Sequence, residues 1–162
     1  GGRSSLRWSE ERFAELAEKI KTELGAKIIV TGVESERPWA EKIVQRLNGA
    51  AIDLTGQLNL RELIGLLSQV NFIVTNSTGP MHMASAVGAK AVALFCPIKT
   101  ASPVRWRPYG EGHQVLVPPL APCNCSVTNC KRGNCMDLIS VEAAFDKVKD
   151  AVSSVTAGAV KN

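Results

Sequence analysis

Several features that would assign this chain to a common class of protein are missing from its sequence. No apolar run approaches the length of a membrane-spanning helix, and the first ten residues, GGRSSLRWSE, lack the apolar core of a secretion signal. Aromatic residues make up only 5% of the chain and do not interleave with the scattered Lys and Arg residues, so nucleic acid is not an expected partner. Repeats and low-complexity segments are absent too, and 162 residues with 45% hydrophobic content fit a globular domain with its own core.

The motifs of common nucleotide-binding and hydrolytic enzymes are also missing. The sequence has no G-x-G-x-x-G after its first expected strand, no G-x-x-x-x-G-K-[ST] and no G-x-S-x-G. An ordinary dinucleotide-dependent dehydrogenase, a P-loop nucleotide hydrolase and a serine hydrolase are therefore disfavoured. The formal net charge of +4 is mildly basic and suits an anionic small molecule or an anionic membrane surface.

Cysteine is concentrated in one segment. Of the five cysteines, Cys96 lies in an apolar run, and Cys123, Cys125, Cys130 and Cys135 crowd into CNCSVTNCKRGNC. Because no secretion signal is recognised, we expect a reducing compartment and assign no disulfides by default. A structural zinc site, disulfides in an oxidised chain and plain buried thiols remain open. The C-x-C-x4-C-x4-C spacing differs from the usual C-x2-C start of zinc sites, so we predict no metal.

Two kinds of apolar segment alternate along the chain. Short, continuously apolar segments predict strands buried on both faces, and longer segments with helical spacing of apolar residues predict helices. The expected helices cover residues 10–24, 37–49, 59–69, 79–88 and 140–152, and the expected strands cover residues 27–32, 50–56, 71–76, 91–96 and 113–119. This alternation is typical of an α/β fold with a doubly wound parallel sheet. We expect one domain over residues 9–153, a linker or interdomain segment over 1–8 and a flexible tail over 154–162.

One junction between a strand and a helix is rich in small polar residues. In VTNSTGPMHMASAVG, residues 74–88, Thr78 is placed to cap a helix that starts at Gly79, and Pro80 has the right φ for the first turn. Ligands of parallel α/β sheets bind beyond the carboxyl ends of the strands, and the free amides of such a helix start attract anions. With His82 one turn into the helix, the junction is either a cradle for a phosphate or diphosphate, or a capping motif beside a solvated histidine.

The stretch DLTGQLNLRELIGLLSQVNFIVTNSTGPMHMASAVGAKAVALFCPIKTASPVRWRPYG resembles the C-terminal half of bacterial ADP-heptose:lipopolysaccharide heptosyltransferases. The resemblance runs from about Arg7 to Met136. Its most specific parts are T-G-x-x-H at residues 78–82, L-T-G…L-x-E-L-x-x-L-L at 54–67 and A-L-F-x-P…W-x-P-Y-G at 93–110. It implies a GT-B glycosyltransferase whose Rossmann-like C-terminal domain, the part resembled here, holds the sugar nucleotide. The family needs no metal or other cofactor, and its N-terminal domain holds the acceptor and the catalytic carboxylate.

The resemblance also implies roles for individual residues. Thr78, Gly79 and His82 match the family's contacts to the donor diphosphate. Glu36 matches a carboxylate that binds the nucleoside ribose, and Leu58 matches a position whose apolar side chain packs on adenine. From the residues alone, Glu36 is also a first-turn helix acid and Leu58 a loop residue tucked against the core.

The sequence departs from the family pattern at two positions. Ser77 stands where the family usually has the aspartate of N-D-[ST]-G-P-x-H; it keeps hydrogen-bonding capacity without the charge, and we count it among the diphosphate-binding residues. Leu6 stands where the family has a lysine that balances phosphate charge. We expect Arg7 to substitute for that lysine, with Ser4 and Ser5 as nearby hydroxyls.

The function implied by the resemblance is donor binding in an inverting glycosyl transfer of lipopolysaccharide core synthesis. The donor is expected to be a nucleoside-diphosphate sugar of the ADP-heptose type, and a lipid-linked saccharide acceptor to bind the N-terminal domain that this chain lacks. No catalytic residue is therefore expected here, and the chain alone is expected to bind ADP without transferase turnover. The expected location is cytoplasmic, with peripheral contact at the inner face of the cytoplasmic membrane. A non-catalytic nucleotide-binding module and a related enzyme acting on a hexose donor remain alternatives.

Overall fold

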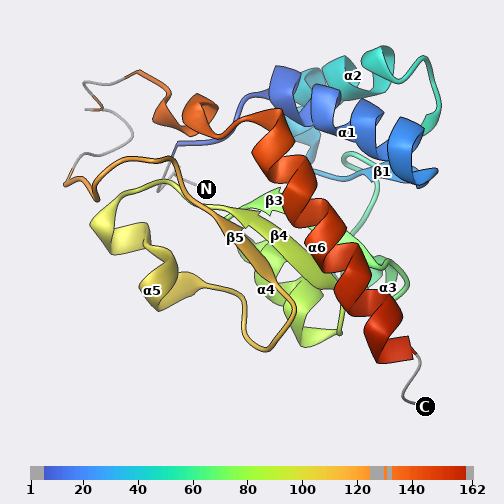
Figure 1. Cartoon of the computed structure of the whole chain (residues 1–162). Coiled ribbons are helices and arrows are strands. Elements are labelled where there is room, and N and C mark those ends of the chain that lie inside the picture. Colours follow the sequence, from blue (N-terminus) through green and yellow to red (C-terminus); the bar gives the residue numbers. More distant parts are fainter. Residues whose placement is uncertain (1–5, 125–129, 131–132, 160–162) are drawn as a thin grey trace. The chain divides into compact units, whose positions relative to one another are not determined.

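The computed structural model describes residues 6–124, 130 and 133–159, and these fall into two units (Figure 1). The first unit is Ser9–Leu63, and the second contains residues 6–8 and the described residues from Ile64 onward. Every strand pairing within the units is parallel, which confirms the α/β class with parallel strands. The described strands form a two-stranded sheet in the first unit and a three-stranded sheet in the second, in place of one continuous sheet.

In the first unit, two strands pair and two helices pack together. Its elements are α1 (Glu10–Leu24), β1 (Ile28–Val30), the 3-10 helix η1 (Glu34–Glu36), α2 (Arg37–Arg46), β2 (Ala51–Asp53) and the start of α3 (Leu60–Leu67). Apolar residues such as Leu16 and Ile20 recur on the buried face of α1, and Gly25 ends that helix in the left-handed conformation, with φ at 63°. α2 contacts α1 and both strands.

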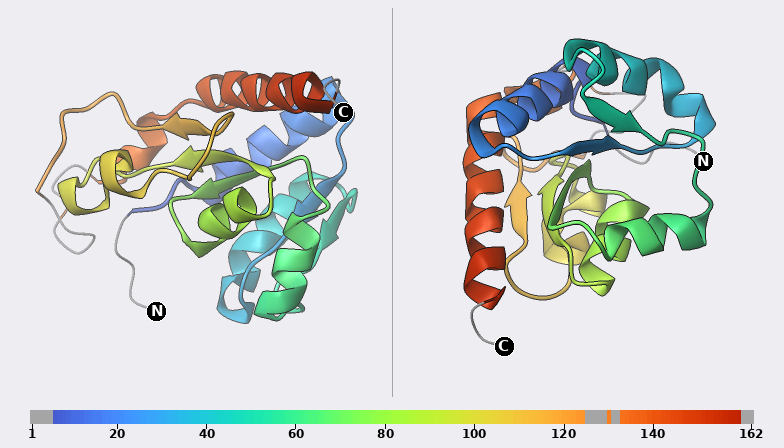
Figure 2. Two further views of the ribbon diagram at one scale, coloured as in Figure 1. Left: turned by 90° about the horizontal axis from the view of Figure 1, so that it is seen from below. Right: turned by 90° about the vertical axis from the view of Figure 1, so that its right-hand side faces the viewer.

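In the second unit, a three-stranded sheet carries a helix on each face (Figure 2). Its elements are the end of α3, β3 (Phe72–Asn76), α4 (Gly79–Ala86), β4 (Lys90–Leu94), η2 (Lys99–Ala101), α5 (Pro103–Trp106), β5 (Gln114–Leu116), η4 (Cys135–Leu138) and α6 (Val141–Ala159). β4 lies between β3 and β5, with α4 on one face and α6 on the other. Met81 of α4 packs with Ala91, Ala93 and Phe95 in a fully buried core. Burial on both faces explains why β4 is apolar after Lys90.

Trp8, two residues before α1, is packed into the second unit. Trp8 is only 2% exposed. Its backbone N–H donates to Oδ1 of Asn76 at 3.0 Å, and its indole N–H donates to the carbonyl of Ile139, also at 3.0 Å. The end of the segment expected to be a linker is thus a packed part of the fold.

The expected helices and strands are confirmed, and four short described elements, η1 among them, are additional. η2, α5 and η4 went unpredicted because segments of four residues or fewer cannot display a helical period. α6 continues to Ala159, so part of the expected flexible tail is helical, and residues 160–162 lie outside the described chain. Across the described helices, none combines the length and apolar character needed to cross a bilayer. The domain limits at 9 and 153 stay a prediction.

Candidate functional site

The candidate site lies where β3 ends and α4 begins. The N–H of Ser77 donates to the carbonyl of Leu94 at 3.0 Å, which continues the pairing of β3 with β4 past its last residue. Thr78 then takes the N-cap position of α4 with an extended backbone, φ −135° and ψ 176°. Met81 donates its N–H to the Thr78 carbonyl at 3.1 Å, and a proline occupies the first turn. The predicted helix start is therefore confirmed.

The side chain of Thr78 does not cap the helix, and the predicted capping bond is wrong. Its hydroxyl lies 3.2 Å from the carbonyl of Asn76, to which it donates, and 3.3 Å from the hydroxyl of Thr75. A nearby carbonyl thus competes successfully for the hydroxyl. Within the described chain, the N–H groups of Thr78 and Gly79 also meet no protein acceptor. The amides at this helix end therefore remain available to an external anion.

Gly79 and His82 keep the surface around the helix start open. Gly79 is exposed, and a side chain built on it would contact only the end of Met83, at 3.4 Å. His82 is exposed one turn further along α4, and its ring meets the ring of Trp106 edge-on, with centroids 6.5 Å apart and planes at 65°. Trp106 belongs to α5, which follows β4, so residues from two neighbouring strand ends meet here.

The four predicted diphosphate-binding residues share this junction in the second unit. They are Ser77, Thr78, Gly79 and His82. Arg7 is half-buried beside Trp8, and its contact with phosphate stays a prediction. Ser4 and Ser5 lie outside the described residues. Variants at this single junction can therefore test whether these residues bind the diphosphate.

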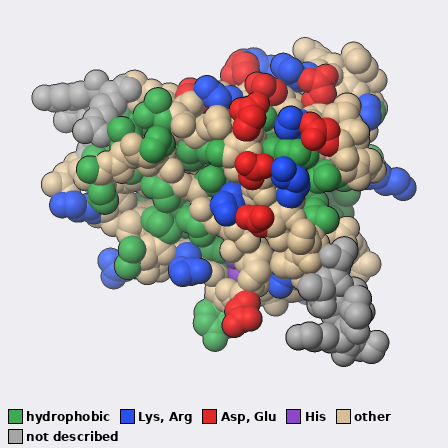
Figure 3. All heavy atoms as spheres, in the orientation of Figure 1, with side chains coloured by type: hydrophobic (Ala, Val, Ile, Leu, Met, Phe, Trp, Pro, Cys, Tyr) green, Lys and Arg blue, Asp and Glu red, His purple; other side chains and the backbone are tan. Residues whose placement is uncertain are grey.

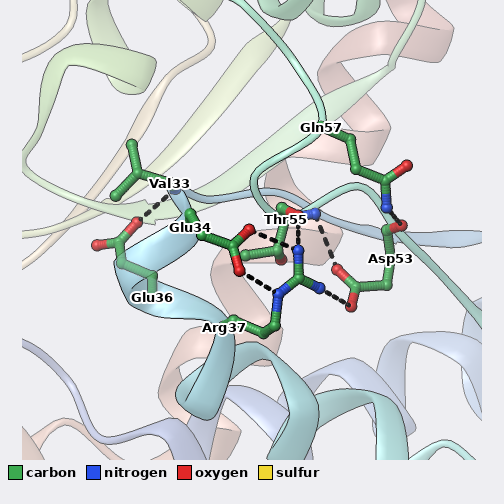
Figure 4. A network of polar contacts seen from close by, with 7 residues as sticks. All are labelled: Val33, Glu34, Glu36, Arg37, Asp53, Thr55 and Gln57. Carbon is green, nitrogen blue, oxygen red and sulfur yellow. Dashed lines mark hydrogen bonds and ion pairs between the residues drawn. The ribbon is translucent and has the colours of Figure 1, made fainter.

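The two predicted nucleoside-binding residues lie in the first unit. Glu36 ends η1, shortly after β1, and its Oε2 accepts the N–H of Val33 at 3.1 Å (Figure 4). This bond fits its interpretation as a first-turn helix acid. Leu58 is half-buried in the loop between β2 and α3. Their contacts with a nucleoside stay predictions.

Arg37 holds a polar network at the carboxyl ends of β1 and β2 (Figure 4). Its guanidinium donates to the two carboxylate oxygens of Glu34 at 2.7 and 2.6 Å and to the carbonyl of Thr55 at 2.7 Å, and it lies 3.9 Å from the Asp53 carboxylate. The bonds from Arg37 lower the pKa of Glu34, and hydrogen bonds from Thr55 lower the pKa of Asp53. Only glycine suits position 56, because φ is 73° and a side chain would collide with Glu34. These loops are therefore tied together by their own side chains.

The sequence marks the segment after β4 by its resemblance to the family, in A-L-F-x-P…W-x-P-Y-G at 93–110, and its charge is a second signal that was not used. Residues 97–110 contain Lys99, Arg105 and Arg107 and no acidic residue. All three side chains are exposed, and Figure 3 shows Lys and Arg side chains beside hydrophobic ones around this segment, at the lower left. A basic, acid-free segment next to Trp106 and the start of α4 suits a site for an anionic ligand.

The described cysteines gather near the end of β4. Cys96, Cys130 and Cys135 are free thiols, and Cys123 is disulfide-bonded, which the expectation of a reduced cluster did not include. Burial and the neighbouring Cys96 and Cys130 raise the pKa of Cys135 to about 11, so this thiol is protonated at neutral pH. Cys125 lies outside the described residues. Among the described side chains, no three His, Cys, Asp or Glu groups are arranged to hold a metal ion.

Comparisons with known proteins place the chain among glycosyltransferases. The model of glycosyltransferase family 9 (heptosyltransferase) matches residues 3–136. Lipooligosaccharide heptosyltransferase 2 of Haemophilus influenzae is 34% identical over 95 residues, which are 56% of this chain and 27% of that protein. Lipooligosaccharide heptosyltransferase 2 of Campylobacter jejuni is 25% identical over 156 residues, 93% of this chain and 48% of that protein. The chain thus spans about half the length, or less, of these relatives.

Two solved structures share the fold. Glycosyl transferase family 9 from Veillonella parvula superimposes with a TM-score of 0.75 at 24% identity, covering 95% of this chain and 44% of that one. The ADP-heptose lps heptosyltransferase II of Escherichia coli superimposes with a TM-score of 0.74 at 22% identity, covering 93% of this chain and 43% of that one. The arrangement of parallel strands and helices is therefore that of known family 9 structures.

Proposed function

Because the chain belongs to glycosyltransferase family 9 (heptosyltransferase), we propose that it is the donor-binding half of an inverting glycosyltransferase whose donor is ADP-heptose. The observation that carries the proposal is the uncapped start of α4. Thr78 occupies the cap position without a side-chain capping bond, and Gly79 next to it is exposed. The backbone N–H groups at this helix end, which no side chain caps, therefore favour binding of an anion.

The diphosphate of the donor is the anion that we assign to this helix end. The amides of Thr78 and Gly79 and the hydroxyl of Ser77 are within one turn of each other, and His82 adds a ring N–H donor from the next turn. When the bond between sugar and diphosphate breaks, negative charge grows on the departing ADP. Donors that are already in place stabilise that charge without reorganisation. Lys99 and Arg105 increase the positive potential around it.

The rest of the donor and the acceptor are assigned by family membership. We propose that Glu36 contacts the ribose and that Leu58 packs on the adenine. The acceptor is a lipid-linked saccharide of lipopolysaccharide synthesis, at the cytoplasmic face of the membrane. The chain covers 48% or less of the curated relatives described above, and we assign the acceptor and the catalytic base to sequence outside it. The chain alone should therefore bind ADP and show no transfer.

Calorimetric titration with ADP tests the donor site, with two glycine variants as a matched pair. Gly79→Ala fits the protein, since the added methyl meets only the flexible end of Met83 at 3.4 Å, but the methyl stands where a phosphate must approach. Gly65→Ala adds the same methyl to α3, where nothing lies within 4 Å. We expect ADP to bind Gly79→Ala about tenfold more weakly or worse, a loss of about 1.4 kcal/mol, and Gly65→Ala like the parent. Equal affinity of the two variants, or no heat with the parent chain, contradicts the proposal.

A non-catalytic nucleotide-binding module is the second candidate, and the uncharged Ser77 favours it. Ser77→Asp places at this position the residue that the family usually carries. If the chain is a donor-binding half, this change should alter affinity for ADP-heptose more than affinity for ADP, because the sugar lies beyond the diphosphate. A module that holds only the nucleotide should show the same change for both ligands.

A further inference from the structure

We propose that Trp106 is a positioning residue for His82, and that its indole holds the imidazole in the orientation that meets the donor diphosphate. This inference rests on the proposed function, because it deepens the role of one residue at the same site. Trp106 lies on α5, an element that neither composition nor helical spacing predicts. Its contact with His82 joins the segment after β4 to the helix after β3.

The indole is itself held in place. Its ring N–H donates to the carbonyl of Thr100 at 3.0 Å, and its backbone N–H donates to the carbonyl of Ser102 at 3.1 Å. Ser102 and Pro103 start the short helix that carries it, and Pro103 fixes φ in the first turn. Trp106 is nevertheless 48% exposed. A large aromatic side chain that is anchored but half in solvent is poorly explained by a core-packing role.

His82 has little else to orient its ring. The residue is exposed on α4, where its backbone carbonyl accepts the Ser85 hydroxyl at 2.9 Å, and within the described chain its imidazole has no hydrogen-bond partner. The described contact of the imidazole is the edge-on one with Trp106, at 6.5 Å between centroids and 65° between planes. Such pairs are favourable because the positive edge of one ring faces the negative face of the other.

A fixed imidazole binds a phosphoryl oxygen better than a free one. A side chain that already has its bound rotamer loses less conformational freedom when the ligand arrives. The expected gain from one aromatic pair is about 2-fold to 10-fold in affinity. Removing the indole should therefore weaken ADP binding by that factor without affecting the fold, because nearly half of the side chain is in solvent.

The chain has only two histidines, which makes proton NMR of the imidazole C–H groups a direct test. His113 serves as an internal control, because its Nδ1 is bonded to the N–H of Ala91 at 3.0 Å and it lies on another segment. In Trp106→Ala, the His82 resonances should move, since the ring current of the indole is lost, and the His113 resonances should stay. Val104→Ala, on the same short helix and 93% exposed, should change neither.

ADP titration of the same variants completes the test. We expect affinity to fall about 2-fold to 10-fold in Trp106→Ala, less in Trp106→Phe, which keeps an aromatic ring, and not at all in Val104→Ala. If ADP binds the parent but Trp106→Ala leaves either the His82 resonances or the affinity unchanged, the positioning role is overturned while the donor site stands. If the parent chain binds no ADP, the donor site and this inference both fall, even if the His82 resonances move.

Discussion

The junction between β2 and α3 and the junction between β3 and α4 both lead from a parallel strand into a helix, but the two helix starts differ in their capping. Before α3, the Oδ1 of Asn59 accepts the N–H groups of Arg61 and Glu62 at 2.9 and 3.1 Å, and Glu62 returns a bond to the Asn59 N–H at 2.8 Å. Before α4, Thr78 makes no capping bond. The N-terminal amides of α3 are therefore capped by protein side chains, whereas those of α4 are free to bind a ligand.

Other helix starts show that the difference is local. Ser140 caps α6 by accepting the N–H of Ala143 at 3.1 Å, and Glu36 accepts the N–H of Val33 at the start of η1. Glu36 and Ser102 make no side-chain cap for α2 and α5 either, but these helices follow the 3-10 helices η1 and η2 and do not come directly after a strand. Lack of a cap matters for function where it coincides with the carboxyl end of a strand, and α4 meets both conditions.

The largest expected effect comes from giving α4 the kind of start that α3 has. Thr78→Asp places a resident carboxylate at the cap, where it accepts the free amides and excludes a second anion. We expect ADP affinity to fall at least about tenfold and the free energy of unfolding to rise by about 1 kcal/mol. Calorimetry and urea denaturation measure the two changes.

Ser140→Asp is the control for that change. It puts the same carboxylate on α6, whose start is already capped, and it should leave ADP affinity unaltered. A Thr78→Asp chain that gains stability and still binds ADP like the parent would place the ligand elsewhere. The contrast between the two junctions would then concern stability alone.

The second largest effect is expected on stability, when the capping side chain of α3 is removed. Asn59→Ala removes the acceptor of two helix amides and should cost about 1 kcal/mol of unfolding free energy. Thr78→Ala removes a hydroxyl that, among the described residues, bonds the Asn76 carbonyl and the Thr75 hydroxyl, and it should cost less than half as much. Urea denaturation of both variants, with Asn59→Ser as the rescue, measures the difference. Equal costs would mean that Thr78 acts as a cap in solution.

The sequence predicted the position of the α4 junction but not its hydrogen bonds. Strand and helix periods fix where β3 ends, and the small polar residues mark Thr78 and Gly79. The direction of the Thr78 hydroxyl depends on the Asn76 carbonyl, which local propensity does not encode. The contact of Trp106 with His82 depends on a helix too short to show a period.

In the first unit, the contacts of Arg37 were likewise only partly predictable from the sequence. Arg37 lies at a visible helix start, and its pairing with Glu34 at i−3 follows from helix geometry. Its bond to the carbonyl of Thr55 requires β1 and β2 to be side by side, so it emerges only after the strands pair. Local sequence patterns therefore locate candidate residues, and tertiary contacts decide which of their side chains already have hydrogen-bond partners within the protein.

A smaller effect on stability is expected from weakening the hydrogen bonds of Arg37 to Glu34 and Thr55. Arg37→Lys keeps the charge but cannot bind both oxygens of Glu34 and the Thr55 carbonyl at once. With the side chain 35% exposed, we expect only a small loss of stability in urea denaturation, because solvent screens an exposed ion pair. Arg46→Lys, which alters the exposed pair of Arg46 with Glu18, is the matched control and should be neutral. A neutral Arg37→Lys would show that the network adds no stability to the first unit.

The smallest effect separates a histidine that the fold uses from the one assigned to the ligand. The Nδ1 of His113 accepts the N–H of Ala91 at 3.0 Å, which requires an unprotonated ring nitrogen. Burial, with Lys90 and Arg107 nearby, lowers the pKa of His113 below its ordinary 6.5. The unfolded chain therefore binds more protons than the folded one between the lowered pKa and 6.5. This contribution to stability is complete above pH 6.5 and is lost as the pH falls through the folded pKa.

His113→Asn isolates that contribution, because the amide oxygen can accept the Ala91 N–H at every pH and does not titrate. Urea denaturation at a series of pH values should show the parent losing stability relative to this variant as the solution is acidified. Parallel curves for His113→Asn and the parent would mean that protonated His113 is accommodated without loss, and the contrast between the two histidines would then lie in ADP binding alone.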